Sequence, residues 1–196
     1  VNNYSTTGNT IAMLRGGNIQ MEGNIINDYA PSSPLTNEEL GTTLLWCGEQ
    51  GGKATLIGNE ATGMKLLATV SDGAGIDSFT IIAYDNRFEG DTRIYCNKVR
   101  RLNLLFNRNT FFSSNMNFFL QEFATEGALV FKNNEVHAQN GQLMTHWSST
   151  PTSAMRFNTL EVTGNTFYGT KGEKDVLRNI TNVKHRDVSG NIYYQR

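Results

Sequence analysis

The sequence predicts an all-β chain folded as a parallel β-helix, and two regularities support this prediction. An asparagine recurs at intervals of 23 to 35 residues, at Asn24, Asn59, Asn86, Asn109, Asn134, Asn165 and Asn191. Apolar residues recur five and three residues before it and two residues after it, and the two-residue spacing of the first pair is that of side chains on one face of a strand. A unit of roughly 20–50 residues that repeats in this way is typical of solenoids. We therefore expect a β-helix of about seven coils, one for each asparagine.

The asparagines are predicted to stack as a ladder. Strands of neighbouring coils lie about 4.8 Å apart, which is close enough for stacked asparagine side chains to hydrogen-bond with one another. Asparagine also tolerates the left-handed backbone region better than other non-glycine residues, so we expect it to make the bend between two strands. A glycine precedes it in four repeats, as Gly23, Gly58, Gly164 and Gly190.

The residues five and three before each asparagine, and two after it, are predicted to point inward and form the core. One inward stack contains Phe88, Phe111, Phe167 and Tyr193. Arg186 breaks the pattern before the last asparagine, and a polar residue suits a terminal coil because a solenoid needs polar caps. The first ten residues hold no amphipathic helix, so we expect the β-helix to lack an N-terminal cap of its own.

A second strand is predicted upstream of each asparagine. Its apolar row is Leu45, Leu67, Ile94, Phe119, Met144 and Leu177. Cys47 and Cys96 belong to these strands, in a column with Thr69, Gln121 and His146. Two coils separate the cysteines by about 9.6 Å, whereas a disulfide requires Cα atoms within about 7 Å. We therefore expect two free, buried thiols.

One domain is expected over residues 1–196, as the mature form or as part of a longer chain or assembly. Three insertions interrupt its regular coils, at 28–42, 71–78 and 148–155. Binding residues often concentrate in long loops on a regular scaffold, so these insertions are candidate sites.

The composition argues against several kinds of partner. A net charge of −1 with 18% charged residues is unlike nucleic-acid-binding proteins, which carry basic patches. We interpret the cluster Lys98, Arg100 and Arg101 as a solvated turn facing Asp91 and Glu89. No apolar run is long enough to predict membrane insertion. Cysteine and histidine are too sparse for a metal cage, so neither a metal nor a cofactor is expected.

The repeated pattern in Leu160–Phe167 (LEVTGNTF) and Leu129–Val136 (LVFKNNEV) resembles the right-handed parallel β-helix superfamily. This pectin-lyase-like group includes polysaccharide lyases, glycoside hydrolases and phage tailspikes, and the resemblance extends from about Met13 to Tyr194. It implies a single-stranded, right-handed β-helix that binds or cleaves polysaccharide along an exposed sheet. It also implies an extracellular, cell-surface or virion location.

The candidate catalytic residues are Asp72, Asp77 and Glu122. The stretch Ser71–Asp77 (SDGAGID) is similar to a degenerate form of the NTDGID element of polygalacturonase-like hydrolases, whose later elements are absent here. Acid–base cleavage of a glycosidic bond requires two carboxyl groups about 5–9.5 Å apart. The sequence leaves open whether the chain is an enzyme and, if it is, whether it is a lyase or a glycoside hydrolase.

Two further groups of residues are candidates for binding. Trp147 and His146 are candidates for carbohydrate contact, because an aromatic face stacks on a pyranose ring. The alternative is that Trp147 packs beneath its own loop and that His146 belongs to the core.

Ile82, Leu105 and Val130, each four residues before an asparagine, are predicted to point outward as an apolar stripe. Exposed apolar stripes mark interfaces, which favours an oligomer contact in a side-by-side homotrimer. The alternative is that the insertion 28–42 covers the stripe.

The sequence therefore predicts a surface- or virion-associated domain that recognises a polysaccharide or cell-surface glycan. Two alternatives remain, a polysaccharide-cleaving enzyme and a purely structural shaft of a fibre or adhesin.

Overall fold

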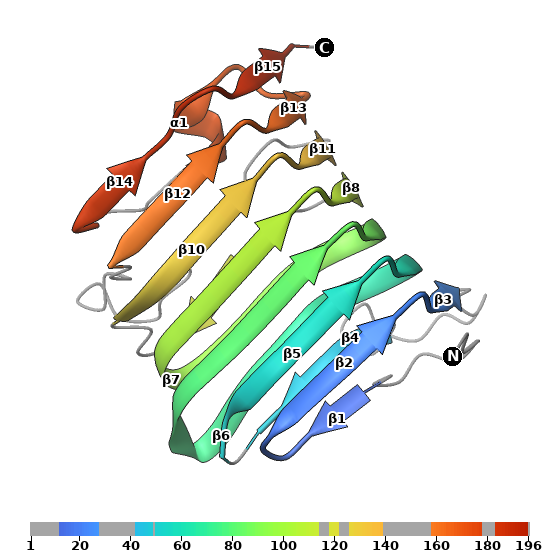
Figure 1. The fold of residues 1–196 in the computed structure, drawn as a ribbon, viewed down its shortest axis with the longest axis vertical. Coiled ribbons are helices and arrows are strands. Elements are labelled where there is room, and N and C mark those ends of the chain that lie inside the picture. The colour runs from blue at the N-terminus through green and yellow to red at the C-terminus, as the bar shows by residue number, and fades with distance from the viewer. Residues whose placement is uncertain are drawn as a thin grey trace, which may run out of the picture.

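The computed structural model describes residues 12–27, 42–48, 50–113, 118–121, 126–138, 158–177 and 183–195. Most of these residues are in strands, and all the strand pairs that they form are parallel (Figure 1). The described part of the chain is therefore an all-β stack of parallel strands, consistent with a β-helix-like solenoid.

The strand segments fall into series according to their position around the asparagines. The pre-asparagine series contains β2 (Asn18–Glu22), β5 (Gly52–Ile57), the end of β6 (Glu60–Tyr84), the end of β7 (Arg87–Asn107), β10 (Glu126–Lys132), β12 (Thr159–Thr163) and β14 (His185–Asp187). The post-asparagine series contains β3 (Ile25–Asn27), the starts of β6 and β7, β8 (Thr110–Ser113), β11 (Glu135–Ala138), β13 (Thr166–Tyr168) and β15 (Ile192–Tyr194). The third series contains β1 (Ala12–Leu14), β4 (Thr42–Cys47), the middles of β6 and β7, and β9 (Phe118–Gln121).

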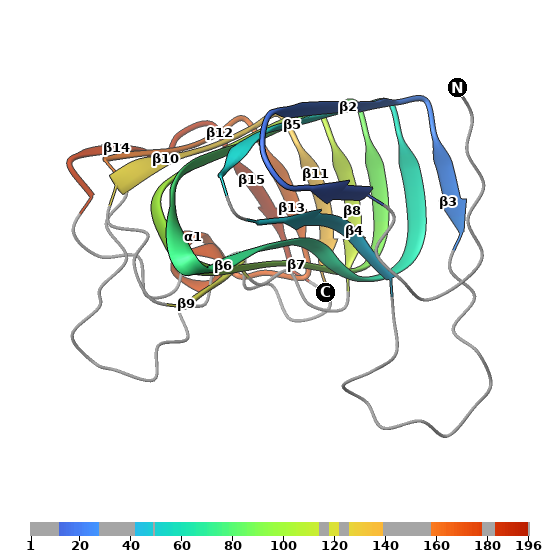
Figure 2. The same ribbon diagram turned by 90° about the horizontal axis from the view of Figure 1, so that it is seen from below.

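Strands β6 and β7 run through all of these series without interruption. They are 25 and 21 residues long, and in Figure 2 both curve round from one side of the molecule to the other. Their pairing shifts at several points, between Ala61 and Met64 and again between Ser71 and Ile76. Such irregularities bend a strand and let one chain segment form successive sides of a coil. Residues 71–78, where an insertion is predicted, are therefore part of β6.

The register of the pre-asparagine and post-asparagine series confirms the alignment on the asparagines. The residues five before the asparagine pair in sequence from Ile19 through Ala54 and onward to Leu160 and Arg186. Those between Ala54 and Leu160 are fully buried, as predicted for the core. Arg186 is exposed and forms an ion pair with Glu173 of the short helix α1 (Glu173–Val176).

The aromatic core is continuous, although not within one column. Phe88 and Phe111 have ring centroids 5.4 Å apart, and Phe167 and Tyr193 are 5.5 Å apart. The smaller Val136 separates these pairs in the predicted column. Phe131, from the pre-asparagine series, fills this gap and stacks at 5.6 Å on Phe111 and 6.3 Å on Phe167.

The predicted register of the third series is wrong by one residue in two strands. Leu45 pairs with Ala68 rather than Leu67, and Ile94 pairs with Phe118 rather than Phe119. The pairing of β4 with β6 shifts between Thr42 and Thr43, whose partners are Met64 and Leu66, and such a slip of one residue changes which residues stand opposite each other.

The same slip changes the cysteine column, which runs from Cys47 through Val70 and Cys96 to Leu120 instead of through Thr69 and Gln121. The two cysteines are nevertheless two strands apart, as predicted. Cys47 is a free, buried thiol, and burial raises its pKa to about 12. His146 and Met144, which were also assigned to the third series, lie outside the described residues.

The predicted insertions at 28–42 and 148–155 also lie outside the described residues, except for Thr42, which begins β4. Within the described ranges, no helix is both long enough and apolar enough to cross a bilayer.

Candidate functional site

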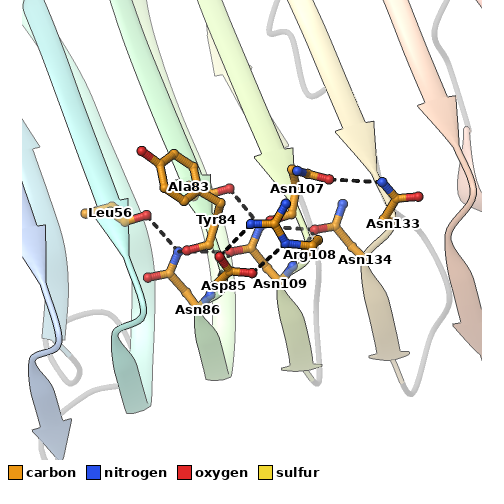
Figure 3. Close-up of polar contacts among 10 residues, drawn as sticks. All are labelled: Leu56, Ala83, Tyr84, Asp85, Asn86, Asn107, Arg108, Asn109, Asn133 and Asn134. Carbon is orange, nitrogen blue, oxygen red and sulfur yellow. Dashed lines mark hydrogen bonds and ion pairs between the residues drawn. The ribbon is translucent and has the colours of Figure 1, made fainter.

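The asparagine ladder supports, from inside the molecule, the turns between the pre-asparagine and post-asparagine strands. Each side-chain amide from Asn24 to Asn165 donates to Oδ1 of the next asparagine, at 2.8 to 3.1 Å. The backbone N–H of each donates to the same oxygen. From Asn59 onward the amide also donates to a backbone carbonyl of the preceding pre-asparagine strand, as Asn86 does to Leu56 of β5 at 3.0 Å (Figure 3). These buried amides are satisfied by one another and by the backbone, which fixes the turns in position.

The residue that makes each bend is not the asparagine, contrary to the sequence-based prediction. The preceding residue adopts a positive φ in all seven turns, at Gly23, Gly58, Asp85, Arg108, Asn133, Gly164 and Gly190, with values from 52° to 66°. The asparagine side chain has to point inward to join the ladder, so the left-handed residue is placed one position earlier.

Three consecutive turns carry a side chain at this left-handed position. Asp85 accepts two hydrogen bonds of 2.7 Å from Arg108, one from Nε and one from Nη2. On the next turns, Asn133 donates to Asn107 at 3.1 Å, and Figure 3 shows both contacts on successive turns. We call Asp85, Arg108, Asn133 and Asn107 the polar ridge. The Asp85 and Arg108 side chains are 46% and 57% exposed, so the polar ridge is available to solvent.

The polar ridge also constrains the glycine on the turn that follows it. A Cβ on Gly164 would lie 2.6 Å from Oδ1 of Asn133, so the Asn133 side chain would have to move to admit it. At Gly58, on the other side of the polar ridge, an added Cβ meets nothing within 4 Å. The polar ridge therefore occupies space that an ordinary side chain on the next turn would need.

Of the predicted catalytic residues, only Asp77 has a described side chain. It is exposed and bonds to Arg101 and, at 3.2 Å, to Arg100. The hydrogen bond from Arg101 is the largest influence on the Asp77 carboxyl and lowers its pKa. A carboxyl held in its ionised form is a poor proton donor at neutral pH. The backbone of Asp72 is part of β6, while Glu122, His146 and Trp147 lie outside the described residues.

The predicted contacts of the basic cluster are partly wrong. Glu89 pairs with Arg87 at 3.3 Å, and Arg100 and Arg101 pair with Asp77. The reason is again the bend of β6, which brings Asp77 beside the neighbouring residues of β7.

The apolar stripe Ile82, Leu105 and Val130 is present as a row of adjacent residues on three strands. Ile82 pairs with Leu105, and Leu105 pairs with Val130. All three side chains are partly exposed, and the row is bounded by Thr55 and Glu161. Its role as an oligomer interface remains a prediction.

The structure contains a second outward row, which the sequence analysis missed. Phe112, His137, Tyr168 and Tyr194 stack in order on β8, β11, β13 and β15, with centroids 4.5, 4.3 and 5.0 Å apart. We call these four residues the outer aromatic row. Arg87 covers the first ring, with its guanidinium carbon 4.2 Å from the Phe112 centroid. At the other end Tyr194 is 49% exposed, next to Ile192 at 52%.

The signal for the outer aromatic row was present in the sequence. Its members stand three residues after Asn109, Asn134, Asn165 and Asn191, one position beyond the inward column. Adjacent positions on a strand face opposite sides, so the row next to an inward column is expected to face outward.

Charged side chains border the outer aromatic row. His137 Nε2 and Glu135 Oε1 are 2.6 Å apart, and Arg87 lies 3.7 Å from Glu60 and 3.3 Å from Glu89. Within the described ranges, no group of three or more histidine, cysteine or acidic side chains is arranged to hold a metal ion.

Comparison of the chain with protein-family models, curated proteins and solved structures found no match.

Proposed function

We propose that this chain recognises polysaccharide through outward side chains of a right-handed, pectin-lyase-like parallel β-helix of about seven coils. In this proposal it acts outside the cell, on a cell surface or on a virion. The observation that carries the proposal is the outer aromatic row, which ends in the exposed ring of Tyr194.

The geometry of the outer aromatic row suits a sugar at its end and along its edge. The interior rings are stacked within 12° of parallel, so their faces are used by one another and their edges point to solvent. Tyr194 has Tyr168 on one face, and its exposure leaves ring surface for the apolar face of a pyranose. Tyrosine hydroxyls along the edge can hydrogen-bond sugar hydroxyls.

The scaffold supports this role because it is rigid. Each strand of the outer aromatic row begins directly after a ladder asparagine, whose side chain is held by hydrogen bonds to its neighbours. Side chains held in place before binding lose less conformational entropy when a ligand arrives. Tyrosine adds large contact area with few rotatable bonds.

The bonds of Asp77 to Arg100 and Arg101 favour its ionised carboxylate, which suits the nucleophile or base of a glycoside-cleaving pair and not the acid. Recognition comes before cleavage in this proposal because the sequence lacks the later elements of the hydrolase pattern. A purely structural shaft is the second candidate, because the continuous asparagine ladder and aromatic core would stiffen a fibre without any ligand.

Binding to immobilised mannan, dextran, galactan, alginate and polygalacturonate tests the proposal. We predict that Tyr194→Ala weakens binding to whichever polymer the unaltered chain retains by about tenfold, equivalent to about 1.4 kcal/mol, because it removes the exposed stacking face. Tyr84→Ala is the matched control, since Tyr84 is a partly exposed tyrosine of the pre-asparagine series.

Three other results would contradict parts of this proposal. Equal losses in the two tyrosine variants would remove the outer aromatic row as the site. A shortened polymer, read by size-exclusion chromatography, would make the chain an enzyme. No retention of any polymer by the unaltered chain would favour the structural shaft.

A further inference from the structure

We propose that the polysaccharide bound at the outer aromatic row carries free amino groups. This inference rests on the proposed function and adds the chemical class of the sugar. One protonated amine would lie on the open face of Tyr194, and another would lie beside the carboxylate of Glu135. Both residues belong to the post-asparagine series, on β15 and β11, which have only β13 between them (Figure 1).

The first observation is that the outer aromatic row already holds a cation of the chain itself. At its first ring, the guanidinium carbon of Arg87 lies 4.2 Å from the Phe112 centroid. Arg87 also pairs with two carboxylates, with Nε 3.7 Å from Glu60 and Nη2 3.3 Å from Glu89. The face of an aromatic ring attracts a cation through its π-electrons, and nearby carboxylates add to this attraction. A ring face bordered by carboxylates is therefore how this surface holds a positive charge.

The second observation is that the last ring of the row has an open face. Tyr168 stacks on one face of Tyr194, with centroids 5.0 Å apart and rings 12° from parallel. Among the described strands β15 pairs with β13 alone, and Tyr194 is 49% exposed. Within the described residues, no cation lies over Tyr194 as Arg87 lies over Phe112. The open face of Tyr194 can therefore take an ammonium group from a ligand.

The third observation is a carboxylate beside the middle of the row. Glu135 Oε1 lies 2.6 Å from Nε2 of His137, and the Glu135 side chain is 48% exposed. The residues paired with Glu135 on the neighbouring strands are Thr110 and Thr166, which are uncharged. Among the described residues, no lysine or arginine forms an ion pair with Glu135. Its second carboxylate oxygen can accept a charge-assisted hydrogen bond from an ammonium group.

The net charge of this face favours a cationic sugar over an acidic one. Among the described outward residues of the post-asparagine strands, the charged side chains are Glu60, Arg87, Glu89 and Glu135. Three carboxylates against one guanidinium leave a charge of −2 while His137 is neutral, and of −1 when it is protonated. Such a face repels the carboxylates of a uronate polymer and attracts ammonium groups, since complementary charge decides between partners of similar shape.

The separation of the two positions favours a polymer over a single amino sugar. Tyr194 and Glu135 are two strands apart, which is about 9.6 Å at the usual strand spacing. One ammonium group cannot contact both, whereas amines repeated along an extended sugar chain can. The second contact then forms within an already bound molecule, so the two contacts reinforce each other.

The test compares immobilised glucosamine oligomers with the same oligomers after N-acetylation, which removes the charge of the amine and keeps the sugar ring. At mildly acidic pH, where the amines are protonated, we expect the unaltered chain to bind the amino form at least about fivefold more tightly. Polygalacturonate should bind less well than either form. Raising the ionic strength from about 0.01 M to about 1 M shortens the screening length from about 30 Å to about 3 Å and should remove most of the preference.

Three variants locate the preference on the outer aromatic row. Glu135→Gln keeps the size of the side chain and removes its charge, so it should weaken binding of the amino form about threefold and leave the acetylated form unchanged. Tyr194→Ala should weaken the amino form more than the acetylated form, because it removes the ring face that attracts the cation. Asp187→Asn is the matched control, since it removes one negative charge from the exposed strand β14 of the pre-asparagine series and should change neither. Glu135→Gln and Asp187→Asn should leave the Tm unchanged, because both replace exposed side chains.

The outcomes separate this inference from the proposed function. Equal binding of the amino and acetylated forms would overturn the inference, as would equal effects of Glu135→Gln and Asp187→Asn. If Tyr194→Ala weakens both forms equally and Glu135→Gln weakens neither, the outer aromatic row binds sugar without selecting amines, so only this inference fails. The same holds if the chain retains a neutral or acidic polymer more tightly than the amino form. If the unaltered chain retains no polymer of any kind, both proposals fail together.

Discussion

Single asparagines hold this chain together by a division of labour between neighbouring residues. The asparagine supplies a buried amide to the ladder, while the residue before it supplies the left-handed bend. Asn109 illustrates the first role, because its Oδ1 accepts from both the backbone and the side chain of Asn86. The second role leaves one position per turn free to be glycine or, on the polar ridge, a polar side chain.

Replacement of a ladder asparagine should be far more damaging than replacement of an outward one. Asn109→Leu leaves the two donors of Asn86 without their acceptor in a buried site, so we predict a loss of about 3–5 kcal/mol in the free energy of unfolding. Urea unfolding followed by circular dichroism measures it. The control Asn103→Leu removes only a 3.4 Å contact with Thr80 at a partly exposed position, and should change stability by about 0.5 kcal/mol or less. Similar losses in the two variants would contradict a special role for the ladder.

Strands β5 and β10 of the pre-asparagine series are positioned by close backbone contacts where they begin, as well as by the ladder where they end. At the start of β10, Gly127 has a φ of 140°, and an added Cβ would lie 2.0 Å from the carbonyl oxygen of Leu102. Gly52 at the start of β5 makes a similar approach to Gly17. Glycine is thus required at these starts by space, whereas at Gly58 it is favoured by backbone conformation alone.

This difference predicts unequal effects of alanine at two glycines. Gly127→Ala forces backbone movement between β10 and β7, so we expect a loss of about 3 kcal/mol or more in the free energy of unfolding. Gly58→Ala has open space and should lose only about 1–2 kcal/mol, from the left-handed conformation. The melting temperatures of the two variants, measured side by side, check the order. If Gly127→Ala melted at a higher temperature than Gly58→Ala, the close approach of Gly127 to Leu102 at the start of β10 would be wrong.

The molecule as a whole presents distinct outward surfaces on one continuous core. The outer aromatic row belongs to the post-asparagine series and the apolar stripe to the pre-asparagine series, with the polar ridge at the turns between them. A flat stripe of Ile82, Leu105 and Val130 would suit a side-by-side contact with a second copy, since contiguous exposed apolar residues commonly form interfaces.

The oligomeric state of a stripe variant tests that contact. If the chain forms a trimer through the stripe, Leu105→Glu places a carboxylate in its centre and should yield a folded monomer, measured by light scattering with size-exclusion chromatography. Thr55→Glu, at the border of the stripe, is the control and should leave the assembly intact. An assembly that is the same size with and without the Leu105→Glu change would remove the stripe from the interface.

The sequence by itself determined the strand order around the asparagines, their ladder and the inward columns, because stacked coils repeat one local pattern at fixed offsets. It failed in the third series, where the pairing of β4 with β6 shifts between Thr42 and Thr43, so that Leu45 stands opposite Ala68 rather than Leu67. It also misplaced the left-handed residue, since asparagine and its predecessor both suit a bend and only the ladder decides between them. Tertiary structure alone decided that Asp77 meets Arg100 and Arg101, that Phe131 closes the gap beside Val136, and that Arg108 reaches Asp85. These contacts join residues on different turns, and their distances depend on bends that no single repeat encodes.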